Sequence, residues 1–121
     1  MKIIILGRLP STSHIYKYRS TGKFLMGYMS KEGKEAKKML QDEFIVQYRH
    51  KPLTCNLKLT VSYFWGDRRI RDIDNFSKLW MDAGTGIIWE DDSQIVELTL
   101  KKFYDKNNPR IEIEIHDTPK T

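Results

Sequence analysis

The sequence is poor in the residues that build disulfides and zinc sites. Cys55 is the one cysteine, and there are three histidines among the 121 residues. A single cysteine excludes a disulfide within the chain, and one cysteine with scattered histidines does not match the ligand spacing of zinc sites. Because disulfides stabilise many proteins of oxidising compartments, this composition indicates a reducing, cytosolic setting.

Long apolar runs and glycine-rich phosphate loops are also missing. No stretch approaches the roughly 20 apolar residues of a membrane-spanning helix, so we expect no membrane partner. The apolar run Ile3–Leu6 is too short for the core of a signal peptide and predicts a buried, central strand. The lack of a glycine-rich loop argues against the larger nucleotide- and sugar-binding domains as a scaffold.

The composition predicts one globular domain with an uneven charge. With 40% hydrophobic and 31% charged side chains, we expect a single domain over residues 1–121. Residues 1–60 hold 12 Lys/Arg and 4 Asp/Glu, a net +8, whereas residues 61–121 hold 9 and 12, a net −3. A basic half beside an acidic half suits a protein that binds a polyanion and performs metal chemistry on it. Solvated surface lysines are the alternative explanation.

Hydrophobic periodicity predicts an α/β domain of the α+β type. We expect a small mixed β-sheet of about four strands with two principal helices, in the order β-loop-α-β-α-β-β. Ser30 is placed to cap a helix that runs to about Arg49, and strict alternation predicts a half-buried strand over 55–65. Asp74 or Asn75 is expected to cap the second helix.

The last two predicted strands cover about 94–104 and 110–116 and flank a turn at 106–109. We therefore expect them to pair as an antiparallel hairpin. Glu112 and Glu114 alternate with buried isoleucines on the last strand. They are expected to pair with lysines of the neighbouring strand and not to bind a metal.

Residues 7–29 show no clear period and are expected to form a long loop. Basic and aromatic side chains are interleaved there, a pattern typical of nucleic-acid contacts in which cations meet phosphates and rings meet exposed bases. The predicted DNA contacts in this loop are Lys17, Arg19 and Lys23. An ordinary surface loop whose tyrosines pack on the core is the alternative.

The strongest functional pattern lies between Arg68 and Asp92. Asp72 and Asp74 are two residues apart, so on an extended segment their side chains project together. Two anions aimed at one point favour a hard divalent ion such as Mg²⁺ between them. Lys78 lies one helical turn beyond Asp74, so its ammonium can return towards these carboxylates.

A second acidic cluster, Glu90-Asp91-Asp92, precedes a predicted strand. With the first pair it forms a set suited to one or two Mg²⁺ ions that activate a phosphodiester for cleavage. The adjacent basic residues Arg68, Arg69 and Arg71 would bind neighbouring phosphates. Asp-x-Asp by itself is shared with metal-dependent sugar transferases and phosphatases. Asp82 fits either a catalytic role or a helix-surface ion pair with Lys78.

The combined motif is more specific than its parts. Arg69-x-Arg71-Asp72-Ile73-Asp74-Asn75-x-x-Lys78, followed by Asp82, Trp89 and Asp91-Asp92-Ser93-Gln94-Ile95-Val96, resembles the RusA family of Holliday-junction resolvases. The opening segment Ile3–Ser13 and the helix start Ser30-Lys31-Glu32-Gly33 extend the resemblance over most of the chain. The link at Gly84–Ile88 and the loop at Ser11–His14 depart from the family pattern.

The resemblance implies an activity, its ions and its partners. It implies a metal-dependent endodeoxyribonuclease that acts on branched DNA as a homodimer, uses Mg²⁺ (with Mn²⁺ as a substitute) and needs no small-molecule cofactor. The implied catalytic residues are Asp72, Asp74, Lys78 and Asp92. The implied metal ligands are Asp72, Asp74 and Asp92, with Asp91 in a secondary, supporting position. Small members of this kind are often encoded by phages or prophages.

Two further hypotheses compete with the nuclease. In the first, the chain is a non-catalytic nucleic-acid-binding module whose carboxylates pair with Arg68, Arg69 and Arg71. In the second, it is a sugar-transferring or phosphatase-like enzyme. The binding module would not depend on a metal ion, and the last class would turn over a small phosphate substrate without DNA.

Overall fold

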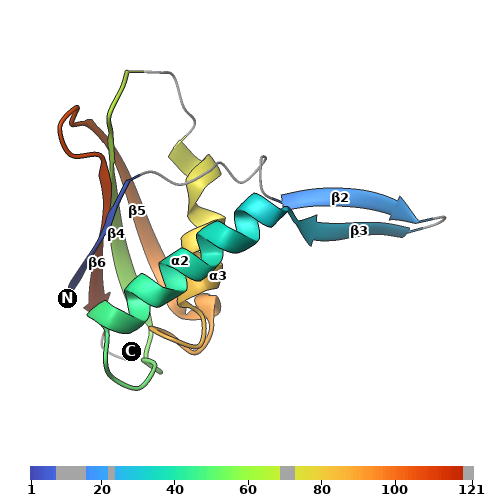
Figure 1. Cartoon of the computed structure of the whole chain (residues 1–121). Helices are drawn as coiled ribbons and strands as arrows, with labels where there is room; N and C mark the ends of the chain where they lie inside the picture. Colours follow the sequence, from blue (N-terminus) through green and yellow to red (C-terminus); the bar gives the residue numbers. More distant parts are fainter. Residues whose placement is uncertain (8–15, 22–23, 69–72, 119–121) are drawn as a thin grey trace.

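A four-stranded sheet with two helices on one face forms the body of the protein (Figure 1). The computed structural model describes residues 1–7, 16–21, 24–68 and 73–118, and for residues 16–21, 24–27, 74 and 75 it describes the backbone alone. The sheet strands are β1 (Lys2–Leu6), β4 (Leu57–Trp65), β5 (Ile95–Tyr104) and β6 (Arg110–Asp117). The helices are α2 (Lys31–Gln47) and α3 (Ser77–Gly84). This is the mixed α+β arrangement that the sequence predicts.

Strand β4 lies inside the sheet and supplies much of the core. Its side chains alternate as predicted, since every second residue is buried beneath the helices. The buried positions are Leu57, Leu59, Val61, Tyr63 and Trp65. β4 pairs antiparallel with β6 and parallel with β5, so both of its backbone edges are bonded within the sheet.

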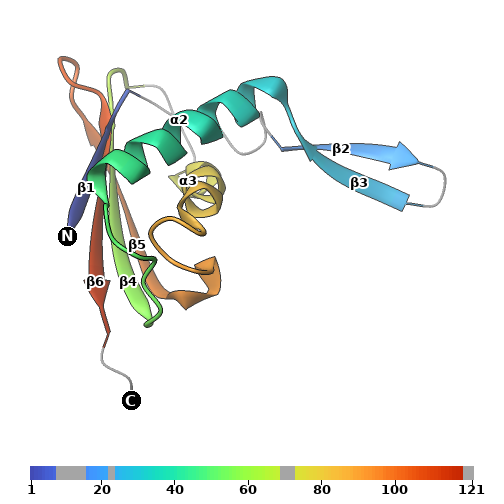
Figure 2. The same ribbon diagram turned by 60° about the horizontal axis from the view of Figure 1, so that its bottom comes forward.

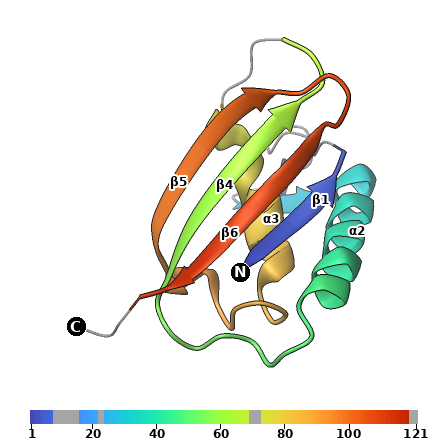
Figure 3. The same ribbon diagram turned by 90° about the vertical axis from the view of Figure 1, so that its left-hand side faces the viewer.

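The expected hairpin of the last two strands is wrong. The sheet order is β1-β6-β4-β5, so β4 lies between β5 and β6 (Figure 3). Burial explains this order, because the alternating isoleucines of β6 are almost completely buried whereas β5 is exposed along most of its length. A parallel partner for β4 requires a crossover, and α3 provides it.

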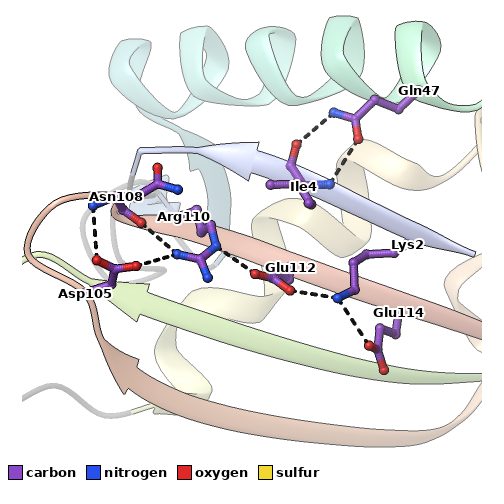
Figure 4. Close-up of polar contacts among 8 residues, drawn as sticks. All are labelled: Lys2, Ile4, Gln47, Asp105, Asn108, Arg110, Glu112 and Glu114. Atoms are coloured by element: carbon purple, nitrogen blue, oxygen red, sulfur yellow. Dashed lines mark hydrogen bonds and ion pairs between the residues drawn. The ribbon is translucent and has the colours of Figure 1, made fainter.

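Strand β1 lies at the edge of the sheet, not in its centre as expected. Ile3 and Ile5 are buried, but Leu6 is 70% exposed. The side-chain amide of Gln47 closes the unpaired backbone of this strand: it accepts a hydrogen bond from the Ile4 N–H at 3.0 Å and donates to the Ile4 carbonyl at 2.8 Å (Figure 4). A helix side chain therefore satisfies the edge groups of Ile4, which another strand would otherwise bond.

Helix α2 begins and ends close to its predicted limits. The Ser30 hydroxyl accepts a hydrogen bond from the Gly33 N–H at 3.1 Å, which is the predicted N-cap. Leu40 and Phe44 are fully buried against the sheet. After the helix, the hydroxyl of buried Tyr48 donates to the Lys51 carbonyl at 2.8 Å, which fixes the turn that leads to β4.

The expected loop over 7–29 contains a second, two-stranded sheet. β2 (Tyr16–Thr21) and β3 (Phe24–Met29) pair antiparallel, from Tyr16 opposite Met29 to Thr21 opposite Phe24. This hairpin projects away from the main sheet beyond the start of α2 (Figures 1 and 2). The long-loop prediction is therefore wrong for residues 16–21 and 24–29, while 8–15 and 22–23 lie outside the described residues.

Ion pairs cross the open face of the sheet. Lys2 contacts Glu112 at 3.0 Å and Glu114 at 3.6 Å, and Arg110 bonds Glu112 at 2.7 Å and Asp105 at 2.8 Å (Figure 4). The hydrogen bond from Lys2, together with that from Arg110, lowers the pKa of Glu112. The two glutamates thus pair with a lysine of the neighbouring strand, as predicted, although that strand is β1. No helix in the described part of the chain is long and apolar enough to cross a membrane.

Candidate functional site

The predicted carboxylates lie along the crossover from β4 to β5. After β4 the chain forms a 3₁₀ turn, η1 (Ile73–Phe76), and then α3, and it enters β5 through a second 3₁₀ turn, η2 (Asp92–Gln94). Because β4 and β5 are parallel, α3 runs back along them (Figures 1 and 3). The Asp74 backbone therefore precedes α3, and Asp91 and Asp92 follow it.

The start of α3 is held by a buried hydrogen-bond chain. The indole N–H of Trp80 donates to the Tyr63 hydroxyl at 2.8 Å, and that hydroxyl lies 3.2 Å from the Ser77 hydroxyl. Burial raises the pKa of Tyr63 above its ordinary value, so the phenol stays neutral and remains a donor and acceptor. Sequence reasoning missed this role of Tyr63 and Ser77, because two residues 14 positions apart show no joint pattern.

The predicted N-cap of this helix is wrong. Phe76 occupies the N-cap position of α3 without a side-chain hydrogen bond, and Asp74 and Asn75 lie within η1. The predicted buried face is confirmed for Phe76, Leu79, Trp80 and Ala83. Tertiary contacts thus replace the local cap at the start of this helix.

The end of α3 packs tightly on the segment that returns to the sheet. A Cβ on Gly84 would lie 2.5 Å from Cζ2 of the fully buried Trp89 ring. The Trp89 indole N–H donates to the Thr85 hydroxyl at 3.2 Å, and its ring meets that of Trp80 edge-on with centroids 6.3 Å apart. Trp89, a residue of the functional motif, therefore has a structural role.

The turn η2 is built by two residues of the acidic motif. Asp91 caps it by accepting hydrogen bonds from the Ser93 N–H and hydroxyl, while the Gln94 side chain accepts from the Asp91 N–H at 2.9 Å. The hydrogen bonds from Ser93 lower the pKa of Asp91. The Gln94 amide also donates to the Leu53 and Cys55 carbonyls at 2.8 and 2.9 Å. Asp91 and Gln94 thus fix the backbone that carries Asp92.

Asp92 is the first residue of η2 and is half-buried. No hydrogen bond or ion pair of its side chain is found among the described residues. η2 packs beside α3, so this carboxylate borders the crossover helix. A carboxylate oxygen in this position is a suitable donor for a hard divalent cation.

Lys78 lies on the exposed surface of α3. Its ammonium contacts the Asp82 carboxylate at 3.3 Å, one helical turn along. The ion pair expected between Asp82 and Lys78 is therefore present. The side chain of Lys78 is 55% exposed, so it can reach a ligand above the helix without rearrangement of the core.

The predicted arginines and lysines are placed unevenly. Arg68 is exposed, and its guanidinium carbon lies 4.2 Å from the centroid of the Tyr104 ring, a cation–π distance. Lys17 and Arg19 lie on β2, where the backbone alone is described. The predicted site residues outside the described residues are Lys23, Arg69, Arg71 and Asp72.

A complete metal site requires the first acidic pair. Among the described side chains, which do not include those of Asp72 and Asp74, no three of Asp, Glu, His or Cys gather as a metal site would need. Asp92 has the right donor chemistry, whereas the Asp91 carboxylate is already engaged by Ser93. The joint binding of Mg²⁺ by Asp72, Asp74 and Asp92 therefore stays a prediction.

Comparison with known proteins gives a match over nearly the whole chain. The family model described as Endodeoxyribonuclease RusA matches residues 9–116, a range that includes every predicted site residue. The chain is also similar to the uncharacterized protein YqaN of Bacillus subtilis (strain 168), with 44% identity over 46 residues. That alignment covers 38% of this chain and 32% of YqaN, so the match spans about a third of the length of this relative.

Proposed function

The chain belongs to the RusA endodeoxyribonuclease family, and from this premise we propose that it resolves Holliday junctions and other branched DNA as a Mg²⁺-dependent homodimer. The observation that carries the proposal is the family match over residues 9–116. The crossover supports it, because α3 is hydrogen-bonded to the buried Tyr63 of β4 through Trp80 and η2 is hydrogen-bonded to the Leu53 carbonyl through Gln94. A rigid backbone is what an active site needs to hold its groups in position.

The residues of the crossover have distinct roles in this proposal. Asp72, Asp74 and Asp92 would hold the ion, and bound Mg²⁺, or Mn²⁺ in its place, would polarise the phosphodiester and activate a water. Lys78 places positive charge beside the phosphate whose negative charge grows during cleavage. Asp82 orients the Lys78 ammonium through their 3.3 Å contact. Asp91 supports the site by capping η2.

The basic half of the chain would bind the DNA. The hairpin that carries Lys17 and Arg19 stands off the main sheet (Figure 2), and the major groove of DNA admits a two-stranded ribbon of this kind. Lys23 lies between the two strands in the sequence. Arg68, Arg69 and Arg71 would bind phosphates next to the cleaved bond.

Two-fold symmetry is the reason for the homodimer in this proposal. A four-way junction has two-fold symmetry, so two sites related by a C2 axis can cut matched strands at equivalent positions. We place this activity in the bacterial or phage-infected cytosol. The single cysteine, Cys55, suits such a reducing compartment.

The test is a gel assay with a synthetic four-way junction and a matched linear duplex, each with Mg²⁺ and with EDTA. Paired symmetric nicks on the junction, with metal only, are expected. Junction binding that is equal with and without EDTA, and without cutting, would instead identify a non-catalytic binding module. Turnover of a small phosphate ester without DNA would favour the sugar-transferase or phosphatase class.

Charge-neutralising variants test the site itself. Asp72→Asn, Asp74→Asn and Asp92→Asn are each expected to abolish cutting while junction binding survives or tightens, since repulsion between carboxylate and phosphate is relieved. Glu114→Gln is the matched control, because Glu114 lies on the open face of the sheet in contact with Lys2. Full cutting by both Asp72→Asn and Asp74→Asn would refute the site assignment.

A further inference from the structure

The two edge strands of the main sheet, β1 and β5, differ in the hydrogen-bond partners of the backbone groups on their outer edges. On β1, the Gln47 amide bonds both backbone groups of Ile4. On β5, the pairing within the described residues is with β4 alone. An edge strand with free N–H and C=O groups is a template for pairing with another chain.

β5 is also more apolar at its surface than a solvated edge requires. Val96 is 55% exposed, Phe103 is 45% exposed and Tyr104 is 42% exposed. Leu98, which faces the helices in register with Leu59 of β4, is 37% exposed. Apolar groups gathered on one unpaired strand indicate a contact surface.

The sequence of β5 is complementary to itself when two copies run antiparallel. The register with β4 places Glu97, Thr99 and Lys101 on the open face of the sheet, opposite Lys58, Thr60 and Ser62. If Thr99 lies opposite Thr99 of the second copy, each Glu97 lies opposite a Lys101. Leu98 then lies opposite Leu100, so opposite charges and apolar side chains both meet suitable partners across the strands.

We propose that β5 pairs antiparallel with β5 of a second copy of this chain, about a two-fold axis at Thr99. The inference rests on the proposed function in one respect, that the active form is a homodimer, and it specifies the surface. The occupant is a second copy and not another protein, because the Glu97–Lys101 complementarity is internal to one sequence. Val96 is the extra residue of a bulge between Ile95 and Glu97, which limits the regular ladder to the segment centred on Thr99.

This pairing would put both candidate sites on the same side of the dimer. Residues opposite each other in an antiparallel pair share one face, so the two open faces would form one surface and the two helix-covered faces the other. Each α3, with its Lys78, would then lie beside the joined β5 strands on a common face. A flat four-way junction laid on that face would meet two sites related by the two-fold axis.

Disulfide trapping tests the register. In a Cys55→Ser background, Thr99→Cys is expected to form a covalent dimer under mild oxidation. Cα atoms opposite each other in an antiparallel pair lie about 4.5–5.5 Å apart, within the range that a disulfide bridges. Lys101→Cys is the matched control on the same face of the same strand. It is expected to stay uncrosslinked, because two copies of position 101 would be about four residues out of register.

Two outcomes of the trapping experiment overturn the inference. One is a dimer by light scattering that does not crosslink through position 99, and the other is equal crosslinking through positions 99 and 101. A monomer at the concentrations used for cutting also overturns it. Crosslinking at position 99 in a protein that fails to cut junctions would support the β5 dimer surface and contradict the proposed function. The two failures are therefore distinguishable.

A charge exchange tests the same pairing without cysteines. Lys101→Glu places two glutamate side chains opposite each other at both symmetry-related positions of the dimer and is expected to weaken dimerisation about tenfold. Adding Glu97→Lys restores opposite charges across the axis and is expected to recover most of that affinity. The Lys58–Glu97 contact at 3.8 Å is lost in the double variant, so Glu97→Gln alone is the control for that loss. Failure of the double variant to recover the affinity contradicts the register.

Discussion

Helices α2 and α3 cover the same face of the sheet but are stabilised by different means. α2 has 17 residues, a side-chain N-cap at Ser30 and an ion pair from Lys38 to Asp42 along its exposed side. α3 has 8 residues and no side-chain cap, and a 3₁₀ turn precedes it. A helix of two turns is not stable alone, so α3 depends on its contacts with Tyr63 and Trp89.

This difference matters for function because α3 belongs to the candidate site. Lys78 lies on α3, and Asp92 follows it on η2, so the positions of both depend on core packing. α2 contributes none of the predicted catalytic residues. Changes in the core beneath α3 should therefore affect both stability and cutting, whereas changes to the start of α2 should affect stability alone.

The largest effect is expected from Gly84→Ala. The new methyl group would overlap the Trp89 ring, whose nearest atom lies 2.5 Å from the ideal Cβ, and the fully buried ring has no space to withdraw. We expect a loss of about 3 kcal/mol in the free energy of unfolding, measured by urea denaturation. Gly86→Ala is the control, since it has open space but a φ of +85° and should cost about 1 kcal/mol. Equal losses in the two variants would mean that packing against Trp89 is not the cause.

The next effect is expected from Tyr63→Phe. The change leaves the buried Trp80 indole N–H without its acceptor, which should cost about 2 kcal/mol and loosen the start of α3. Cutting of the four-way junction should fall even under conditions where the variant is fully folded. The matched control is Tyr48→Phe after α2, where one bond to the Lys51 carbonyl is lost and about 1 kcal/mol is expected. Unchanged cutting by folded Tyr63→Phe would separate α3 from the site.

A smaller effect is expected from Ser30→Ala at the start of α2. It removes the acceptor for the Gly33 N–H and should cost about 1 kcal/mol, with junction cutting per folded molecule unchanged. Ser30→Asp retains a cap acceptor and should retain the stability. A fall in cutting with Ser30→Ala, measured on protein that is fully folded, would show that α2 and the site are coupled after all.

The smallest effect is a difference in acid sensitivity. The Ser30 hydroxyl does not titrate, whereas η2 is capped by the Asp91 carboxylate, whose pKa the Ser93 hydrogen bonds hold below its ordinary value of 3.8. The stabilisation by Asp91 is therefore present above that value and is lost as the pH falls through the lowered pKa. In an NMR titration the side-chain carboxyl carbon of Asp91 should shift with a midpoint below pH 3.8. A midpoint at or above about 3.9, the value of an uncapped Asp, would contradict the cap.

Local patterns predicted the elements of the main sheet better than their arrangement. Alternation identified β4 and β6, and the Ser30 cap with the spacing of Leu40 and Phe44 identified α2. These local patterns could not predict the strand order. The short turn before β6 favours a hairpin of β5 and β6, and no local pattern shows that β4 lies between them. The apolar run of β1 indicated a central strand because side-chain pattern does not reveal that Gln47 covers its edge.

Within the candidate site, the sequence predicted one turn and one ion pair but not the hydrogen bonds that support them. The acidic motif correctly located a structured turn before β5, and Asp82 was recognised as a partner for Lys78. The bonds of Gln94 to the Leu53 and Cys55 carbonyls join segments about 40 residues apart, so no local spacing shows them. The hairpin of β2 and β3 was missed because its aromatic and basic residues were interpreted as ligand contacts and not as a period of two.

The amide of Gln47 has a consequence for the size of any assembly. It bonds both outer backbone groups of Ile4, the middle residue of β1, so a sheet that joins two copies through β5 has β1 at both of its outer edges, each blocked at its midpoint by a helix side chain. A further copy could not pair along the full length of that edge, so one glutamine at the end of α2 would favour a dimer over a longer assembly. Without that closure the same strand pairing would leave a route to open-ended polymers.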